Sequence, residues 1–127
     1  MVNGYGMLNK KKIVVTGGNG RFGRILQTHV ENNYIFPTKK DLNILSSNSI
    51  YSFLKRKKPN YLIHLAGMSR PMHAHETNIE NSIKLNLIGT ANVVLACSKL
   101  NIKIIYFSTS YVYPGLKGNY KETDALL

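Results

Sequence analysis

The chain has 127 residues, 43% of them hydrophobic and 18% charged, which suits one modest globular core and is unlike a disordered chain. No apolar run is long enough to cross a membrane, so we expect no membrane partner. The net charge of +11 admits an anionic partner, but no aromatic stripe or nucleic-acid-binding motif accompanies the lysines, so nucleic acid is the weakest alternative.

Three glycines at three-residue spacing join the first predicted strand, residues 12–16, to the first predicted helix, residues 21–32. Glycine tolerates a positive φ and the close approach of another backbone. Gly17, Gly20 and Gly23 therefore let the strand reverse, a pyrophosphate lie against the main chain and the helix pack tightly. We interpret the segment as a dinucleotide-binding turn; the alternative is an ordinary strand-to-helix turn.

Further strands and helices alternate along the rest of the chain. We expect strands at 34–36, 61–66 and 103–108, and helices at 48–56, capped by Ser46 or Ser47, and at 78–100. This order predicts an α/β fold, a Rossmann-like doubly wound parallel sheet. Ligands of such sheets bind at the carboxyl ends of the strands.

Four segments in order resemble motifs of the extended short-chain dehydrogenases/reductases, the NAD-dependent epimerase/dehydratase superfamily. They are residues 16–23, 65–67, 86–90 and 107–113, the first with the GxxGxxG spacing typical of these enzymes. Within the superfamily the sequence is most similar to the GDP-L-fucose synthase and dTDP-4-dehydrorhamnose reductase families. The resemblance implies that residues 1–127 are an NAD(P)-binding Rossmann domain that is incomplete and lacks the substrate lobe.

The resemblance also implies a set of cofactor-binding residues. Its members are Gly17, Asn19, Gly20, Arg21, Phe22 and Gly23 at the pyrophosphate; Lys39 at the adenosine ribose; Leu42 and Asn43 at the adenine; Leu65, Ala66 and Gly67 at the riboses; Asn86, which would stabilise the neighbouring strand end; and Ser108.

The choice of cofactor depends on the end of the second strand. An acidic residue there would bind the ribose 2′-OH of NAD, whereas a cation would favour the additional phosphate of NADP. No Asp or Glu lies between Glu31 and Asp41, so we expect NADP, bound through Lys39 with help from Arg21, and NAD is the alternative. Lys39 and Lys40 could also form an ordinary solvated loop.

Thr109 matches the catalytic Ser/Thr of the family, whose hydroxyl donates to the sugar. A threonine needs a partner acid, which in the family is a tyrosine followed four residues later by a lysine. Tyr113 and Lys117 have this spacing, but Pro114 and Gly115 predict a loop, and Tyr113 matches another motif. We therefore expect the catalytic pair to be absent from this chain.

Together, these observations predict that the chain is the cofactor-binding portion of an NAD(P)-dependent nucleotide-sugar reductase or epimerase. We expect this portion to be inactive alone. The alternative is a non-catalytic nucleotide-binding or scaffold module of the same fold. A nucleotide sugar is expected as substrate only if a C-terminal half completes the site. The protein partner would be a complementing chain or a second copy.

Histidine and cysteine residues predict no metal site. His64 lies in a buried strand, where a hydrogen-bonded core histidine is expected, and His73 and His75 have only Glu76 as a nearby carboxylate. Cys97 lies in an apolar helical stretch and is expected in the core. A single cysteine and the absence of a signal peptide favour a cytoplasmic location.

Overall fold

The computed structural model describes residues 11–69, 71–109, 112–116 and 118–124. Its centre is a parallel sheet in the order β2-β1-β3-β4, formed by β1 (Ile13–Thr16), β2 (Tyr34–Ile35), β3 (Tyr61–His64) and β4 (Lys103–Tyr106). The predicted parallel α/β fold is confirmed. Each strand is shorter than predicted, because the chain leaves the ladder one or two residues early, chiefly at the carboxyl edge where the connecting loops begin.

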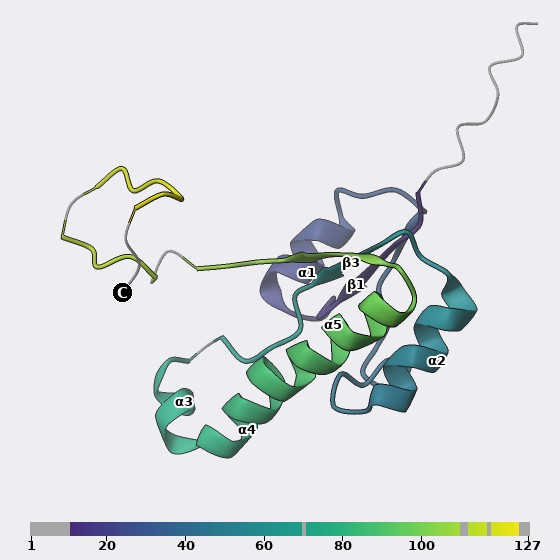
Figure 1. The fold of residues 1–127 in the computed structure, drawn as a ribbon, viewed down its shortest axis with the longest axis horizontal. Helices are drawn as coiled ribbons and strands as arrows, with labels where there is room; N and C mark the ends of the chain where they lie inside the picture. The colour runs from purple at the N-terminus through teal and green to yellow at the C-terminus, as the bar shows by residue number, and fades with distance from the viewer. Residues whose placement is uncertain (1–10, 70, 110–111, 117, 125–127) are drawn as a thin grey trace, which may run out of the picture.

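Helices cover both faces of the sheet (Figure 1). Helices α2 (Ser47–Lys57) and α5 (Gly89–Lys99) lie on the near side, and α1 (Arg21–Gln27) lies on the far side. The prediction that the first helix reaches residue 32 is wrong. It ends at Gln27 because the N–H and hydroxyl of Thr28 both donate to the Ile25 carbonyl, which closes the last turn.

Helix α2 extends one residue beyond each end of the predicted 48–56 and is capped and ended as its sequence predicts. The Ser46 side chain accepts a hydrogen bond from the Ser49 N–H at 3.3 Å, which confirms one of the two expected caps. Lys58 then adopts a left-handed conformation, with φ of 48°, before Pro59 ends any continuation.

The hydrophobic core lies between the sheet and the α2/α5 layer. Val14, Leu62, Leu54 and Val93 have no exposed surface, and Cys97 is 1% exposed. Burial raises the pKa of the Cys97 thiol to about 11, so the thiol stays protonated at neutral pH. The expected core position of Cys97 is confirmed.

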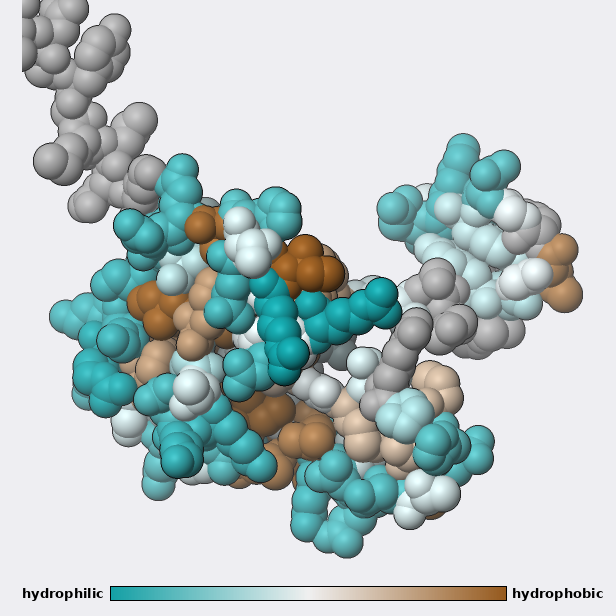
Figure 2. All heavy atoms as spheres, turned by 180° about the vertical axis from the view of Figure 1, so that it is seen from behind, coloured by the Kyte–Doolittle hydropathy of each residue, from teal (hydrophilic) through white to brown (hydrophobic). Residues whose placement is uncertain are grey.

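The opposite face of the sheet is covered less completely. Side chains alternate along each strand, so Val15, Ile63 and Ile105 share the face that carries α1. Val15 is buried, Ile63 is half-buried and Ile105 on the edge strand β4 is 46% exposed. In the view from behind, where α1 is nearer to the viewer, apolar side chains reach the surface between hydrophilic ones (Figure 2).

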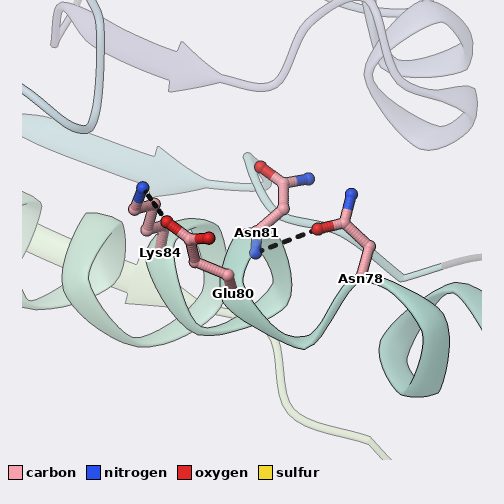
Figure 3. Close-up of polar contacts among 4 residues, drawn as sticks. All are labelled: Asn78, Glu80, Asn81 and Lys84. Atoms are coloured by element: carbon pink, nitrogen blue, oxygen red, sulfur yellow. Dashed lines mark hydrogen bonds and ion pairs between the residues drawn. The ribbon is translucent and has the colours of Figure 1, made fainter.

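The predicted helix at 78–100 is divided, and a short helix precedes it. The structure has α3 (His73–Thr77), which was not predicted, then α4 (Ile79–Ile83), a π-helical turn (Lys84–Ile88) and α5. Asn78 starts α4, because its side chain accepts a hydrogen bond from the Asn81 N–H, and Glu80 pairs with Lys84 one turn later (Figure 3). The sequence pattern followed the helical period through 78–100 but did not reveal the wider π turn.

Candidate functional site

The turn after β1 has the conformation that glycine allows. Gly17 has φ of 74°, and the Gly20 N–H donates to its carbonyl at 2.9 Å. A β-carbon at residue 17 would lie 2.6 Å from the Ala66 nitrogen, closer than real contacts. The turn thus packs directly on the backbone that follows β3, and only glycine meets both requirements.

Helix α1 packs on the same turn and holds two of its carbonyl groups. A β-carbon at residue 23 would lie 2.5 Å from the Gly17 oxygen, so the close helix packing expected of Gly23 is present. The Arg24 Nε donates to the Asn19 carbonyl at 2.9 Å, and the Gln27 Nε2 donates to the Gly18 carbonyl at 2.8 Å. Sequence reasoning missed Arg24 and Gln27; their three-residue spacing on the first helix was the available signal.

Two adjoining cavities follow the carboxyl edge of the sheet, with volumes of about 1000 Å³ and about 260 Å³. Both are lined by Gly17, Ala66 and Gly67. Every residue predicted to bind the cofactor lines one or both. The larger is lined by Gly20, Arg21, Phe22, Gly23, Leu65, Asn86, Ser108 and Thr109, and the smaller by Asn19, Lys39, Leu42 and Asn43.

The charge of these cavities is positive. Among the described residues that line them, the cationic side chains are Lys39 in the smaller cavity and Arg21 in the larger, and there is no Asp or Glu. Lys39 and Arg21 thus line different cavities. Asp41 lies outside both: hydrogen bonds from the Thr38 hydroxyl and N–H, at 2.6 and 2.9 Å, hold the pKa of its carboxyl below the usual range.

Asn86 fixes the loop that follows β3. Its Oδ1 accepts from the Met68 N–H at 2.7 Å, and its Nδ2 donates to the Met68 carbonyl at 2.8 Å. Asn86 lies in the π turn and also touches the position of Gly67, where a β-carbon would be 2.8 Å from its Oδ1. The residue therefore stabilises the segment beyond the strand end, as the sequence indicated.

His64 is a core histidine with both ring nitrogens hydrogen-bonded. The side chain is 2% exposed, Nδ1 lies 2.7 Å from the Thr16 hydroxyl, and Nε2 lies 3.1 Å from the Thr90 hydroxyl. Burial lowers the pKa of the imidazole. The expectation of a satisfied core histidine is confirmed.

The end of β4 reaches the larger cavity. Ser108 and Thr109 are exposed there, and the Phe107 ring lies 5.4 Å from that of Phe22 at the start of α1. The neighbouring motif residues Ser110 and Tyr111, and Lys117 of the Tyr-x-x-x-Lys match, lie outside the described residues. Tyr113 stacks on Tyr120 at 4.9 Å within a turn-rich segment, where the sequence predicted a loop.

In the described part of the chain, no three His, Cys, Asp or Glu side chains come together as a metal site would require. His75 instead contacts the Ser82 hydroxyl at 2.7 Å. None of the helices that the structure describes is long and apolar enough to span a membrane.

Comparison with known proteins gives three informative relatives. The chain is 34% identical over 110 residues to the GDP-L-colitose synthase of Yersinia pseudotuberculosis, covering 81% of this chain and 35% of the synthase. It is 24% identical over 124 residues to the methionine adenosyltransferase 2 subunit beta of Bos taurus, covering 90% and 37% respectively. The structure matches that of the Bacillus anthracis dTDP-4-dehydrorhamnose reductase in complex with NADP, with a TM-score of 0.82, 26% identity and 93% and 43% coverage.

The chain thus spans well under half the length of these relatives. The family described as RmlD substrate binding domain matches residues 11–127, which include the whole glycine turn and each strand that the structure describes. The described fold and the extent of this match together show that the chain belongs to the RmlD substrate binding domain family.

Proposed function

We propose that this chain is the cofactor-binding portion of an NAD(P)-dependent nucleotide-sugar reductase or epimerase. The observation that carries the proposal is the cleft at the carboxyl edge of the sheet, which has a glycine turn at its base, two cations and no carboxylate among its described lining residues. Such a cleft suits an elongated ligand with anionic centres. The cofactor itself would supply the hydride, and this chain would bind and orient it.

We further propose that NADP is preferred over NAD and that the adenosine end occupies the smaller cavity. Lys39 lines that cavity, while the carboxylate of Asp41 is held by Thr38 outside it. A 2′-phosphate beside Lys39 would therefore gain a charge-assisted contact without meeting a competing carboxylate. Leu42, which is 5% exposed, would form part of the apolar wall for the adenine.

Replacing Lys39 by alanine should weaken NADPH binding about tenfold, or ~1.4 kcal/mol, because one phosphate contact is lost. NADH lacks that phosphate, so its affinity should stay within about twofold. Titration calorimetry on the wild-type chain and the Lys39→Ala variant, with both cofactors, measures this difference.

Lys40→Ala provides the matched control, since Lys40 is a neighbouring exposed lysine that does not line either cavity. It should lower NADPH affinity by about twofold at most, through the general loss of one positive charge. Equal losses in the two variants would contradict the specific role of Lys39. Absence of saturable binding of both cofactors to the folded wild-type chain would contradict the proposed function.

The substrate and the partners belong to the proposal as well. Because the relatives extend beyond the matched region, we propose that further residues complete a nucleotide-sugar site against the larger cavity. These residues would belong to the same polypeptide or to a complementing one. We propose that the cofactor-binding portion alone does not turn over substrate. A second copy of the chain is the alternative partner. We propose no membrane or nucleic-acid partner, and a cytoplasmic location that a soluble cofactor would suit.

One relative favours a second candidate function. The Bos taurus protein is named as a subunit of a methionine adenosyltransferase, so a sequence similar to this chain occurs in a subunit named for different chemistry. A nucleotide-binding or scaffold module without its own sugar chemistry is therefore the rival proposal. It predicts cofactor binding but no sugar turnover under any complementation.

A further inference from the structure

A chain of hydrogen bonds runs along the wall of the cofactor cleft, where His64 and Thr90 line the larger cavity and Thr16 lines the smaller. The Ala66 N–H donates to the Thr16 hydroxyl at 3.3 Å, that hydroxyl lies 2.7 Å from His64 Nδ1, and His64 Nε2 lies 3.1 Å from the Thr90 hydroxyl. These hydrogen bonds join β1, β3 and α5, and both Thr16 and His64 are 2% exposed. Sequence reasoning gave His64 no role beyond core packing.

The directions of these hydrogen bonds select one form of the ring. The Thr16 oxygen already accepts from Ala66, so its single proton is free to be donated to Nδ1. Nε2 then carries the ring proton and donates to Thr90. In the opposite tautomer, the His64 Nδ1–H and the Ala66 N–H would both donate to the Thr16 oxygen. The Thr16 proton would then lose Nδ1 as its acceptor, which is costly for a buried hydroxyl.

The Ala66 end of this series of hydrogen bonds is part of the site. Ala66 lines both cavities, and its nitrogen and the Leu65 carbonyl carbon are the two atoms nearest to the position of a β-carbon at residue 17, both at 2.6 Å. Moving the Ala66 peptide would therefore shift the glycine turn and the wall shared by the two cavities. We propose that His64 is a positioning residue of the cofactor site: as the neutral Nε2–H tautomer it accepts the Thr16 proton and so orients the Thr16 oxygen toward the Ala66 N–H, whereas its protonation turns Nδ1 into a donor, leaves the Thr16 proton without this acceptor, and weakens cofactor binding.

The surroundings of the ring favour the neutral form. β1 and α5 present the hydroxyls of Thr16 and Thr90, and β4 presents the titratable Tyr106, whose ring centroid lies 5.9 Å away. No carboxylate is among the described lining residues of the adjoining cavity. Because burial lowers the pKa of His64 in the folded state, the unfolded state binds more protons just below pH 6.5, so the stabilisation that the neutral ring contributes decreases as the pH falls below that value.

A first experiment tests the chain of hydrogen bonds without ligand, so it stands even if the proposed function, on which the binding role rests, fails. Nitrogen NMR of the wild-type chain at pH 7.5 should show His64 with a protonated Nε2 and an unprotonated Nδ1. Exchange of the Ala66 amide, corrected for its intrinsic pH dependence, should rise about tenfold as His64 titrates. The proposal would be overturned by the opposite tautomer, or by an exchange rate of the Ala66 amide that does not change as His64 titrates.

A second experiment measures cofactor affinity from pH 7.5 to pH 5. In the wild type, affinity should fall about tenfold more than in His64→Asn, whose Oδ1 can still accept from Thr16 but does not titrate. NADH is measured beside NADPH, because the 2′-phosphate itself titrates near pH 6. If the wild-type and His64→Asn profiles coincide for both cofactors, the positioning role is refuted.

The matched variant His64→Leu keeps a side chain of comparable bulk but leaves the Thr16 hydroxyl without its acceptor. At pH 7.5 it should bind about tenfold more weakly than His64→Asn, in samples whose circular dichroism shows that both are folded. Should His64→Leu fail to fold, Thr16→Val and Thr16→Ser replace the pair, with the loss expected only for valine. Equal affinities within either pair would overturn the proposal.

Discussion

Replacing Gly17 by alanine should destabilise the chain by about 2 to 5 kcal/mol and abolish cofactor binding at pH 7.5. Two costs add in this variant. A non-glycine residue held at φ of 74° costs about 1–2 kcal/mol, and forcing a methyl group into a space 2.6 Å from the Ala66 nitrogen costs about as much or more. Relief of the clash would move the turn away from the residues after β3, which opens the wall that both cavities share.

Gly115→Ala is the matched control, because Gly115 has nearly the same φ, 69°, but its added β-carbon would meet nothing within 4 Å. This variant should lower the free energy of unfolding by only about 1 kcal/mol, the cost of a non-glycine residue at a positive φ. Urea unfolding of the three proteins, followed by circular dichroism, measures both values. A Gly17→Ala midpoint equal to that of Gly115→Ala would mean that the close approach to Ala66 does not hold in solution.

The sequence predicted the architecture because the strongest signals were local. The buried runs at β1 and β3, the glycine spacing and the serine cap of α2 are each decided by a few neighbouring residues, and each is found in the structure. The order of these elements then limited the topology to a parallel sheet with helices on both faces.

The missed features depend on contacts between distant residues. The π turn carries Asn86, which clamps Met68, 18 residues earlier. Nothing in the helical period of 78–100 distinguishes that turn from an ordinary one. The same holds for the His64 contacts with Thr16 and Thr90, which join residues 48 and 26 positions apart.

At the candidate site, the motifs predicted which residues gather at the carboxyl edge, and the cavities contain all of them. They did not predict how the cations are distributed. Lys39 and Arg21, considered together from the sequence, line different cavities, because one follows β2 and the other begins α1. Contacts with ligand atoms stay a prediction for every one of these residues.

The sheet face beside α1 indicates how the proposed enzyme would be completed. Ile105 on the edge strand β4 is 46% exposed, and Ile25 on α1 is 53% exposed on that side of the molecule. An edge strand with apolar neighbours presents unpaired backbone groups that another strand can bind. The relatives have more than half of their length outside the matched region, so we expect that part of the family fold to cover this face.

On the proposed function, supplying this part should produce a working enzyme. We expect the chain, fused to or mixed with the unmatched C-terminal portion of the Yersinia pseudotuberculosis GDP-L-colitose synthase, to oxidise NADPH in the presence of a GDP- or dTDP-linked keto-sugar at least about 100-fold faster than either part alone. That factor is the contribution typical of a positioned general acid, which the added portion would supply. The rate of NADPH oxidation, with and without the sugar, is the measurement.

Two lysine substitutions show whether the face beside α1 carries this association. Ile105→Lys places a charge where the added strand and its helices would pack, so activity in the mixture should fall at least about tenfold while the isolated chain keeps its NADPH affinity. Leu95→Lys is the matched control, since Leu95 is 58% exposed on α5, the helix that covers the opposite face. The scaffold function would be favoured if the mixtures made with the wild-type chain and with each variant all bind NADPH but none of them oxidises it. Equal loss in the two variants would instead place the association elsewhere on the molecule.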